Sequence, residues 1–158
     1  MQGYYKDENA TKNAFTQEGW LRTGDIGKID EKGHVYIEGR LSENYKNQKG
    51  EFIQPSFIEQ KFAANDLVEN LCLVGRELEA NVMVVSLTEE AIKKPQEEIK
   101  ASLQRTLTAT NKALKGYEKI SKALVVSESW NPESKFLTPT LKVKRREVEA
   151  RYRDFILE

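Results

Sequence analysis

Two short apolar segments constrain the fold of this chain more than any other feature. Residues 71–75 (LCLVG) and 82–87 (VMVVSL) are almost wholly apolar, and the stretch between them is mostly polar. Short apolar segments that are rich in β-branched residues and bounded by turn residues are typical of buried strands. We therefore expect two strands around a polar turn, with Cys72 packed in the core.

Three other segments have helical patterns. Residues 55–64 begin with Pro55, which is favoured in the first turn of a helix, and they predict a short helix. The longest helical pattern begins at Pro95 and ends at Gly116. Its expected buried stripe consists of Ile99, Leu103, Leu107 and Leu114. A basic amphipathic helix is expected from residue 143 to about 155.

The remaining strand signals lie near the start of the chain and beyond the long helix. The first forty residues predict strands and turns, among them a hairpin that joins 27–29 to 34–38. His34, the only histidine, is expected to be exposed beside that turn. Residues 123–126 predict a third core strand. Because strands and helices alternate after residue 50, the sequence predicts an α+β or α/β layered fold.

The charges balance overall but are unevenly distributed. The chain has 25 Lys and Arg residues against 25 Asp and Glu residues, which argues against a simple polyanion binder. Residues 1–80 contain 10 basic and 14 acidic residues, whereas residues 81–158 contain 15 and 11. Much of the basic excess lies between Lys135 and Arg153. This run is either a solvated helix face or a surface that meets phosphates or an acidic neighbouring domain.

Composition also bears on cellular location. The sequence has no apolar run of the length that spans a membrane, and its first residues lack the apolar stretch of a signal peptide. Its single cysteine cannot form an internal disulfide. We expect a cytoplasmic protein with no transmembrane segment.

Two candidate nucleotide ligands lie near the predicted hairpin. Asp25 ends the segment GWLRTGD (19–25), and a carboxylate after a glycine turn can accept hydrogen bonds from both hydroxyls of a ribose. It could equally cap a turn. Arg40 is a bidentate donor suited to phosphate or ribose oxygens, or to a surface ion pair. The sequence contains neither a glycine-rich phosphate loop nor metal-ligand spacing.

A third candidate lies in the segment LTPTLKVKRR (137–146). Thr138, Pro139 and Thr140 are expected to form an extended loop, which leaves Lys142 at its end, just before a helix. A lysine on a mobile loop can be carried into a site, where its ammonium group stabilises a developing anion. Lys142 could also be an ordinary exposed lysine.

Together, these segments resemble the carboxyl-terminal part of the adenylate-forming enzymes, the superfamily of acyl-CoA synthetases, peptide-synthetase adenylation domains and luciferases. The resemblance includes GYYK (3–6), Gly39-Arg40, and IQP (53–55) with Ile58-Glu59, all in the order of the family. The segment LTPTLKVKR (137–145) is most similar to long-chain fatty acyl-CoA synthetases.

The resemblance implies a two-step ligase reaction. A fatty acid carboxylate attacks the α-phosphate of ATP, in the presence of Mg²⁺, and the CoA thiol then displaces AMP. Lys142 would be the catalytic residue, bridging carboxylate and α-phosphate oxygens. Asp25 would hold the ribose hydroxyls, and Arg40 would support the nucleotide. No residue of this chain is expected to bind a metal.

The resemblance also implies roles in the domain movement and in the second step. Glu43 matches the hinge position, where the family more often has Asp. The loop around Lys49 and Gly50 would line the pantetheine channel of CoA, although the family usually has glycine at the position of Lys49. These two departures concern the thioester step more than the adenylation step.

The expected architecture is an α+β fold, a short hairpin plus about three strands flanked by helices. Residues 1–40 would be the β-rich tail of a large N-terminal domain, and residues 41–158 the mobile C-terminal domain. The missing N-terminal domain would be its partner, so we expect the chain alone to be inactive and to bind none of ATP, Mg²⁺ or CoA tightly.

Other functions are also compatible with the sequence. The acceptor could be a carrier protein, or the reaction could stop at the acyl-adenylate. Peripheral contact with a membrane is compatible with the sequence. A non-enzymatic module that binds nucleic acid through the basic run is the alternative from another class, but no aromatic residues interleave with residues 144–146.

Overall fold

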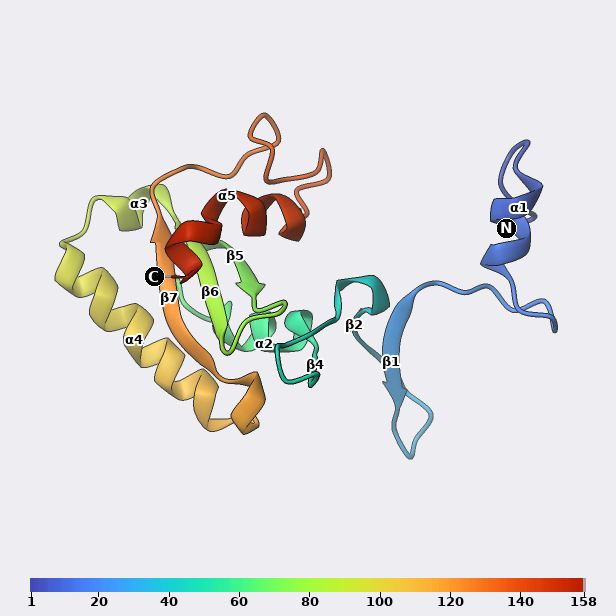
Figure 1. The fold of residues 1–158 in the computed structure, drawn as a ribbon, viewed down its shortest axis with the longest axis horizontal. Helices are drawn as coiled ribbons and strands as arrows, with labels where there is room; N and C mark the ends of the chain where they lie inside the picture. The colour runs from blue at the N-terminus through green and yellow to red at the C-terminus, as the bar shows by residue number, and fades with distance from the viewer. Residues whose placement is uncertain (158) are drawn as a thin grey trace. The chain divides into compact units, whose positions relative to one another are not determined.

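The computed structural model describes residues 1–157 (Figure 1). The chain forms two compact units, Met1–Glu43 and Asn44–Glu158, and each is described by itself. The predicted assignment of residues 1–40 and 41–158 to two domains of a larger enzyme remains a prediction.

The first unit contains a short helix and a hairpin. Helix α1 (Glu8–Ala14) is followed by strands β1 (Asp25–Ile29) and β2 (Val35–Arg40), which pair antiparallel, and by the 3₁₀ helix η1 (Leu41–Glu43). Asp30 organises the turn, since its Oδ1 accepts the backbone N–H groups of Lys32 and His34 at 2.9 Å. The predicted hairpin and the exposure of His34 are therefore confirmed.

Helix α1 was not expected from the sequence, which predicted only strands and turns there. Asp7 caps it, because its Oδ1 accepts the N–H of Ala10 at 2.8 Å. None of its residues is buried, so no apolar periodicity marked it. Indeed, no residue of Met1–Glu43 is buried, and the unit is held by backbone hydrogen bonds, caps and exposed ion pairs rather than by a core.

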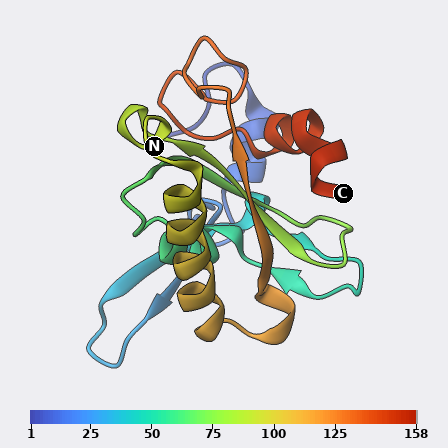
Figure 2. The ribbon, with the colours of Figure 1, turned by 90° about the vertical axis from the view of Figure 1, so that its left-hand side faces the viewer.

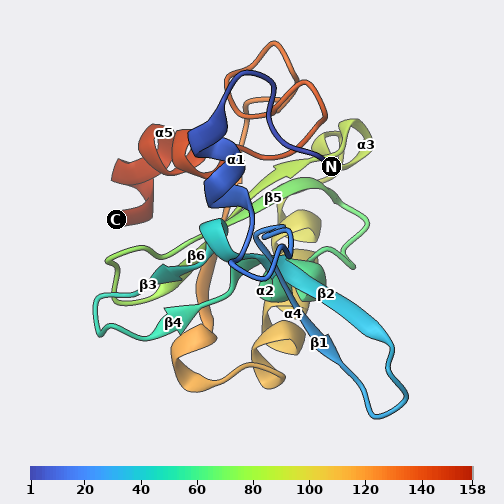
Figure 3. The same cartoon turned by 90° about the vertical axis from the view of Figure 1, so that its right-hand side faces the viewer.

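The second unit is built on a three-stranded sheet in the order β5-β6-β7. Strands β5 (Val68–Val74) and β6 (Asn81–Leu87) pair antiparallel, whereas β6 and β7 (Ile120–Val126) pair parallel. A separate two-stranded hairpin consists of β3 (Tyr45–Lys46) and β4 (Phe52–Ile53), seen in Figure 3. All three predicted strands are confirmed.

Helices cover both faces of the sheet. One core cluster joins Leu73, Met83 and Val85 to α2 (Pro55–Phe62) and α4 (Gln96–Lys112). The other joins Cys72 and Val84 to α5 (Arg145–Leu157). Figure 2 shows α4 running alongside β7. Because alternate side chains of a strand point to opposite faces, the apolar strands predicted from the sequence supply both clusters.

Two short elements complete this unit, α3 (Glu89–Ile92) and the 3₁₀ helix η2 (Gly116–Glu118). The arrangement is α+β, as predicted, with the hairpin and the three-stranded sheet flanked by helices. Cys72 is fully buried, as expected.

Several helix boundaries differ from the prediction, and α2 ends at Phe62 rather than at residue 64. Helix α4 ends at Lys112, not at Gly116, because the side chain of Asn111 bonds both the N–H and the C=O of Ile120 at 2.8 Å and so ties the helix end to β7. Leu114 is buried as expected but lies beyond the helix. Helix α5 begins at Arg145 rather than at residue 143, since Val143 pairs with Leu137 in an isolated β-bridge.

Candidate functional site

The structure brings Asp25 and Arg40 together. They face each other at the open end of the β1–β2 hairpin, where Arg40 Nε lies 2.9 Å from Asp25 Oδ1. Arg40 Nη1 also donates to the C=O of Thr23 at 3.0 Å, and Thr23 Oγ1 accepts the N–H of Asp25 at 3.1 Å. Both side chains remain partly exposed. Two residues predicted separately thus form one hydrogen-bonded group.

Glu43 lies at the end of the first unit. It is the last residue of η1, which follows β2 directly, and Leu41 at the start of η1 donates its N–H to the C=O of Gly24 at 2.8 Å. The chain then enters the second unit at Asn44. The role of Glu43 as a hinge stays a prediction.

Asn47 shapes the tip of the β3–β4 hairpin, which carries Lys49 and Gly50. Its Oδ1 accepts the N–H groups of Lys49 at 3.0 Å and Glu51 at 2.9 Å, and its Nδ2 donates to Glu51 Oε2 at 2.9 Å. Gly50 has φ = +80°, a conformation that favours glycine. The tip is therefore a defined turn, with the side chain of Lys49 exposed.

A hollow of about 440 Å³ lies against this hairpin. It is lined by Lys46 and Arg76, which are cationic, and by Phe52, whose side chain is 56% exposed. Sequence reasoning did not single out these three residues. The only sequence signal for a cationic surface here was Arg76, in the turn after β5. The sequence does not show that this turn lies beside the β3–β4 hairpin.

Lys142 lies at the end of a closed turn. Thr138 donates its N–H to the C=O of Lys142 at 2.8 Å, and its Oγ1 accepts the N–H of Lys142 at 3.0 Å. The N–H of Leu141 bonds the C=O of Thr138 at 2.9 Å, and Leu141 has φ = +61°. The prediction of an extended loop at Thr138–Thr140 is therefore wrong, because Thr138 hydrogen-bonds the backbone of Leu141 and Lys142 and so closes the turn. Lys142 itself is exposed.

Aromatic packing anchors the segment that leads into this turn. Trp130, Phe136 and Tyr152 are buried together, with ring centroids 5.8 to 6.5 Å apart. Leu137, the residue that pairs with Val143 at the base of the turn, belongs to the same cluster. The turn is thus connected directly to the core beneath α5.

Arg145 follows the turn and is the first residue of α5. Its guanidinium group bonds Glu59 through two contacts, Nη1–Oε1 at 2.6 Å and Nη2–Oε2 at 3.1 Å. Both side chains are only 16% exposed. Further along α5, Arg151 pairs with Glu128. The basic run is therefore not one uniform solvated face, since two of its arginines are used in ion pairs.

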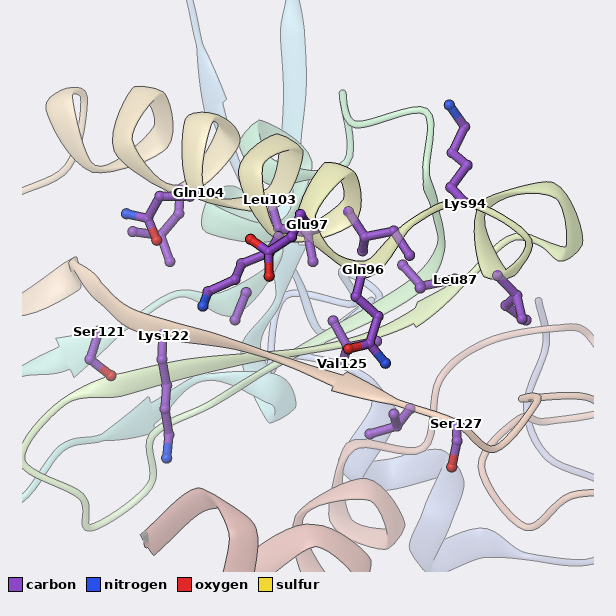
Figure 4. A pocket seen from close by; sticks show the side chains of 16 residues that line it. Leu87, Lys94, Gln96, Glu97, Leu103, Gln104, Ser121, Lys122, Val125 and Ser127 are labelled. Atoms are coloured by element: carbon purple, nitrogen blue, oxygen red, sulfur yellow. The ribbon is translucent and has the colours of Figure 1, made fainter.

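An apolar groove of about 740 Å³ lies between α4 and β7 (Figure 4). Leu103 and Val125 line it, whereas the side chain of Lys122 points away from α4 and donates to the C=O of Phe155 at 3.1 Å. None of the predicted site residues lines this groove. Among residues 1–157, no group of three or more His, Cys, Asp or Glu side chains could hold a metal ion. None of the helices in that range has the length and apolar character needed to cross a membrane.

Comparison with known proteins identifies relatives over almost the whole chain. Long-chain-fatty-acid–CoA ligase 4 of Saccharomyces cerevisiae is 31% identical over 93% of this chain, and fatty acyl-CoA synthetase B of Dictyostelium discoideum is 31% identical over 98%. This chain covers 24% and 25% of those two proteins, about a quarter of the length of each.

Solved structures give the same result. The adenylation domain of a carboxylate reductase from Mycobacterium chelonae superposes with a TM-score of 0.81 and 26% identity. The match covers 98% of this chain and 25% of that one. The family described as AMP-binding enzyme C-terminal domain matches residues 47–158. The predicted resemblance is confirmed, and the chain belongs to this family of C-terminal domains within the adenylate-forming superfamily.

Proposed function

We propose that this chain is the C-terminal part of an ATP-dependent long-chain fatty acid–CoA ligase. The observation that carries the proposal is the match to long-chain fatty acid ligases over nearly the whole chain, together with the small share of those proteins that it covers. In this proposal a fatty acid carboxylate attacks the α-phosphate of ATP and releases pyrophosphate, and the CoA thiol then displaces AMP from the acyl-adenylate.

The surface of the first unit supports the assignment of residues 1–40 to the tail of a larger domain. Its large apolar side chains are exposed, with Tyr5 at 88%, Trp20 at 74% and Ile29 at 71%. A hairpin that has no buried residue is only marginally stable alone. Contact with an upstream domain of the same protein would bury these side chains.

Lys142 is the residue that we assign to catalysis. During adenylation, negative charge develops between the carboxylate and the α-phosphate. An ammonium group about 4 Å from that charge stabilises it by roughly 4 kcal/mol at an effective dielectric constant near 20, before desolvation costs. The exposure of Lys142 on a well-defined turn suits a group that must enter a site formed by another domain.

Asp25 and Arg40 are assigned to the nucleotide. The bond from Arg40 uses Oδ1 of Asp25, and a carboxylate has a second oxygen that can accept from a ribose hydroxyl. Arg40 also carries further N–H donors, which can reach ribose or phosphate oxygens. Their pairing orients both groups before ATP arrives.

The second unit would act in both half-reactions by rotating about Glu43. In the thioester step, the hairpin tip with Lys49 and Gly50 would line the pantetheine channel, beside the hollow that contains Lys46 and Arg76. We assign no residue of this chain to Mg²⁺. The proposed location is cytoplasmic, with peripheral contact to membranes that hold the fatty acid.

A second candidate keeps adenylation but transfers the acyl group to a carrier, or stops at the acyl-adenylate. It is favoured by the structural match to carboxylic acid reductases, one of them the A-PCP didomain from Segniliparus rugosus in complex with AMP, with a TM-score of 0.80 and 26% identity. The two candidates differ in the acceptor, not in the roles of Lys142, Asp25 and Arg40.

The test is to extend the reading frame upstream and to compare the longer protein with the 158-residue chain. We expect fatty-acid-dependent exchange between ATP and pyrophosphate in the longer protein and none in the chain alone. Acyl-CoA formation, in preference to carrier acylation, would select the first candidate. A longer protein that binds no ATP and activates no carboxylate would contradict both.

A further inference from the structure

We propose that Glu59 and Arg145 are a positioning pair, which fixes the turn that carries Lys142. The catalytic part of this inference rests on the proposed function, whereas the structural part does not. Glu59 lies on α2 and Arg145 at the start of α5, 86 residues apart in the sequence. Their contact therefore joins two helices that lie on opposite faces of the sheet.

The pair closes around one residue of the sheet edge. Glu59 Oε1 accepts the N–H of Leu73 at 2.7 Å, and Arg145 Nη1 donates to the C=O of the same residue at 2.6 Å. Leu73 is on β5, which is an edge strand of the three-stranded sheet. The ion pair thus satisfies backbone groups that an edge strand would otherwise leave unpaired, and it fixes Arg145 relative to the sheet.

Backbone hydrogen bonds hold the short segment between Arg145 and Lys142. The N–H of Lys144 donates to the C=O of Phe136 at 2.7 Å, and Val143 pairs with Leu137. The N–H of Lys142 then bonds Thr138 Oγ1 at 3.0 Å. With the ion pair on one side and this bridge on the other, the backbone of Lys142 has little freedom to shift.

The burial and the bidentate geometry of the ion pair indicate that it orients Arg145 rather than adding charge to the surface. At 16% exposure, the two side chains are screened much less than a surface pair. Two parallel N–H···O bonds also fix the direction of the guanidinium plane. Displacement of a catalytic group by about 1 Å can cost about 100-fold in rate. Loosening the pair should therefore reduce the contribution of Lys142 to the first half-reaction.

The structural part is tested by hydrogen exchange in the 158-residue chain. Glu59→Gln keeps the shape of the side chain but removes its charge. Arg145→Lys keeps the charge but removes the guanidinium group that makes two parallel bonds to Glu59. We expect both variants to raise the exchange rates of the amides of Leu141, Lys142 and Lys144 by about tenfold or more. Glu98→Gln, in the exposed pair with Lys94 on the other side of the sheet, is the matched control and should leave these amides unchanged.

The catalytic part is tested by half-reactions of the upstream-extended protein. Glu59→Gln should lower kcat for adenylation by about 10- to 100-fold, with KM for ATP and fatty acid nearly unchanged, while thioester formation from supplied acyl-adenylate is spared. In a Lys142→Ala background the same substitution should have almost no further effect, because the group that it positions is gone.

The outcomes separate the two proposals. Unchanged amide exchange at Leu141, Lys142 and Lys144 in a folded Glu59→Gln variant would overturn the positioning role, whatever the protein catalyses. Increased exchange with equal losses in both half-reactions would show a merely structural pair and would also overturn it. A wild-type extended protein without adenylation activity would overturn the proposed function, and the exchange result would still decide whether the pair fixes the turn.

Discussion

Replacement of Asn81 by alanine should destabilise the second unit strongly, because Asn81 is the centre of a buried polar network. The side chain is 1% exposed. Its Oδ1 accepts from Tyr45 Oη at 2.8 Å, and its Nδ2 donates to the C=O groups of Tyr117 at 3.1 Å and Lys119 at 3.3 Å. The network ties the β3–β4 hairpin, with its candidate CoA loop, to the sheet.

The cost follows from the groups left without partners. Asn81→Ala orphans the Tyr45 hydroxyl, in a side chain that is 3% exposed, and removes a donor from two carbonyl groups. A buried polar group that loses its partner costs about 1–3 kcal/mol. We expect a loss of about 3 kcal/mol. With an m-value of about 1.5 kcal/mol/M, the urea midpoint should fall by about 2 M.

Trp130 provides the assay, because it is one of only two tryptophans and is 2% exposed in the core of this unit. A Trp20→Phe background removes the other reporter. Asn70→Ala is the matched control, since Asn70 is half-buried and its Nδ2 donates to Ser86 Oγ at a longer 3.3 Å. The control should cost about 1 kcal/mol or less.

A double-mutant cycle makes the reasoning refutable. Tyr45→Phe alone should cost about 1 kcal/mol, because Asn81 Oδ1 loses its donor. In the Asn81→Ala background the same substitution should be neutral or stabilising, since it removes an orphaned hydroxyl. An equal cost of Tyr45→Phe in both backgrounds would refute the network.

Three further predictions concern conformation and pH. Burial raises the pKa of Tyr45 well above its usual value of about 10, so only the unfolded chain releases the phenolic proton at moderately alkaline pH. The free energy of unfolding should therefore fall by about 1.4 kcal/mol between pH 9 and pH 11 through this group, and Tyr45→Phe should abolish that component in urea titrations. Gly75→Ala should cost about 2 kcal/mol or more by the same measurement, since a Cβ there would overlap Asn81 Oδ1 and lie 2.6 Å from Tyr45 Oη. In limited proteolysis, residues Met1–Glu43 should be cleaved before the second unit, and protection of both alike would contradict their lack of a core.

The parts of the fold that could be predicted from the sequence are those whose side chains enter the core. Strands β5 and β6 and helix α2 carry apolar residues at positions that the structure buries almost completely. Their patterns are local, so composition and spacing were sufficient. Helix α1 has no buried residue, and its only local signal was the cap at Asp7.

The parts that could not be predicted depend on contacts between distant residues. The end of α4 depends on the bonds from Asn111 to Ile120, and the closed turn at Lys142 depends on the hydroxyl of Thr138. Glu59 was noted as part of a motif, yet nothing in the sequence links it to Arg145. The role of Lys142 itself came from the family resemblance, because an exposed lysine has no distinctive local pattern.

The most direct test of the central claim is a pair of half-reaction measurements on Lys142→Ala in the upstream-extended protein. Lys144→Ala, which removes another exposed lysine of the same segment, is the control. We expect adenylation to slow by about 100- to 1,000-fold, the usual effect of removing one preorganised electrostatic donor, while thioester formation from supplied acyl-adenylate stays nearly unchanged. Equal losses in both half-reactions, or an adenylation rate equal to that of the control, would contradict the account.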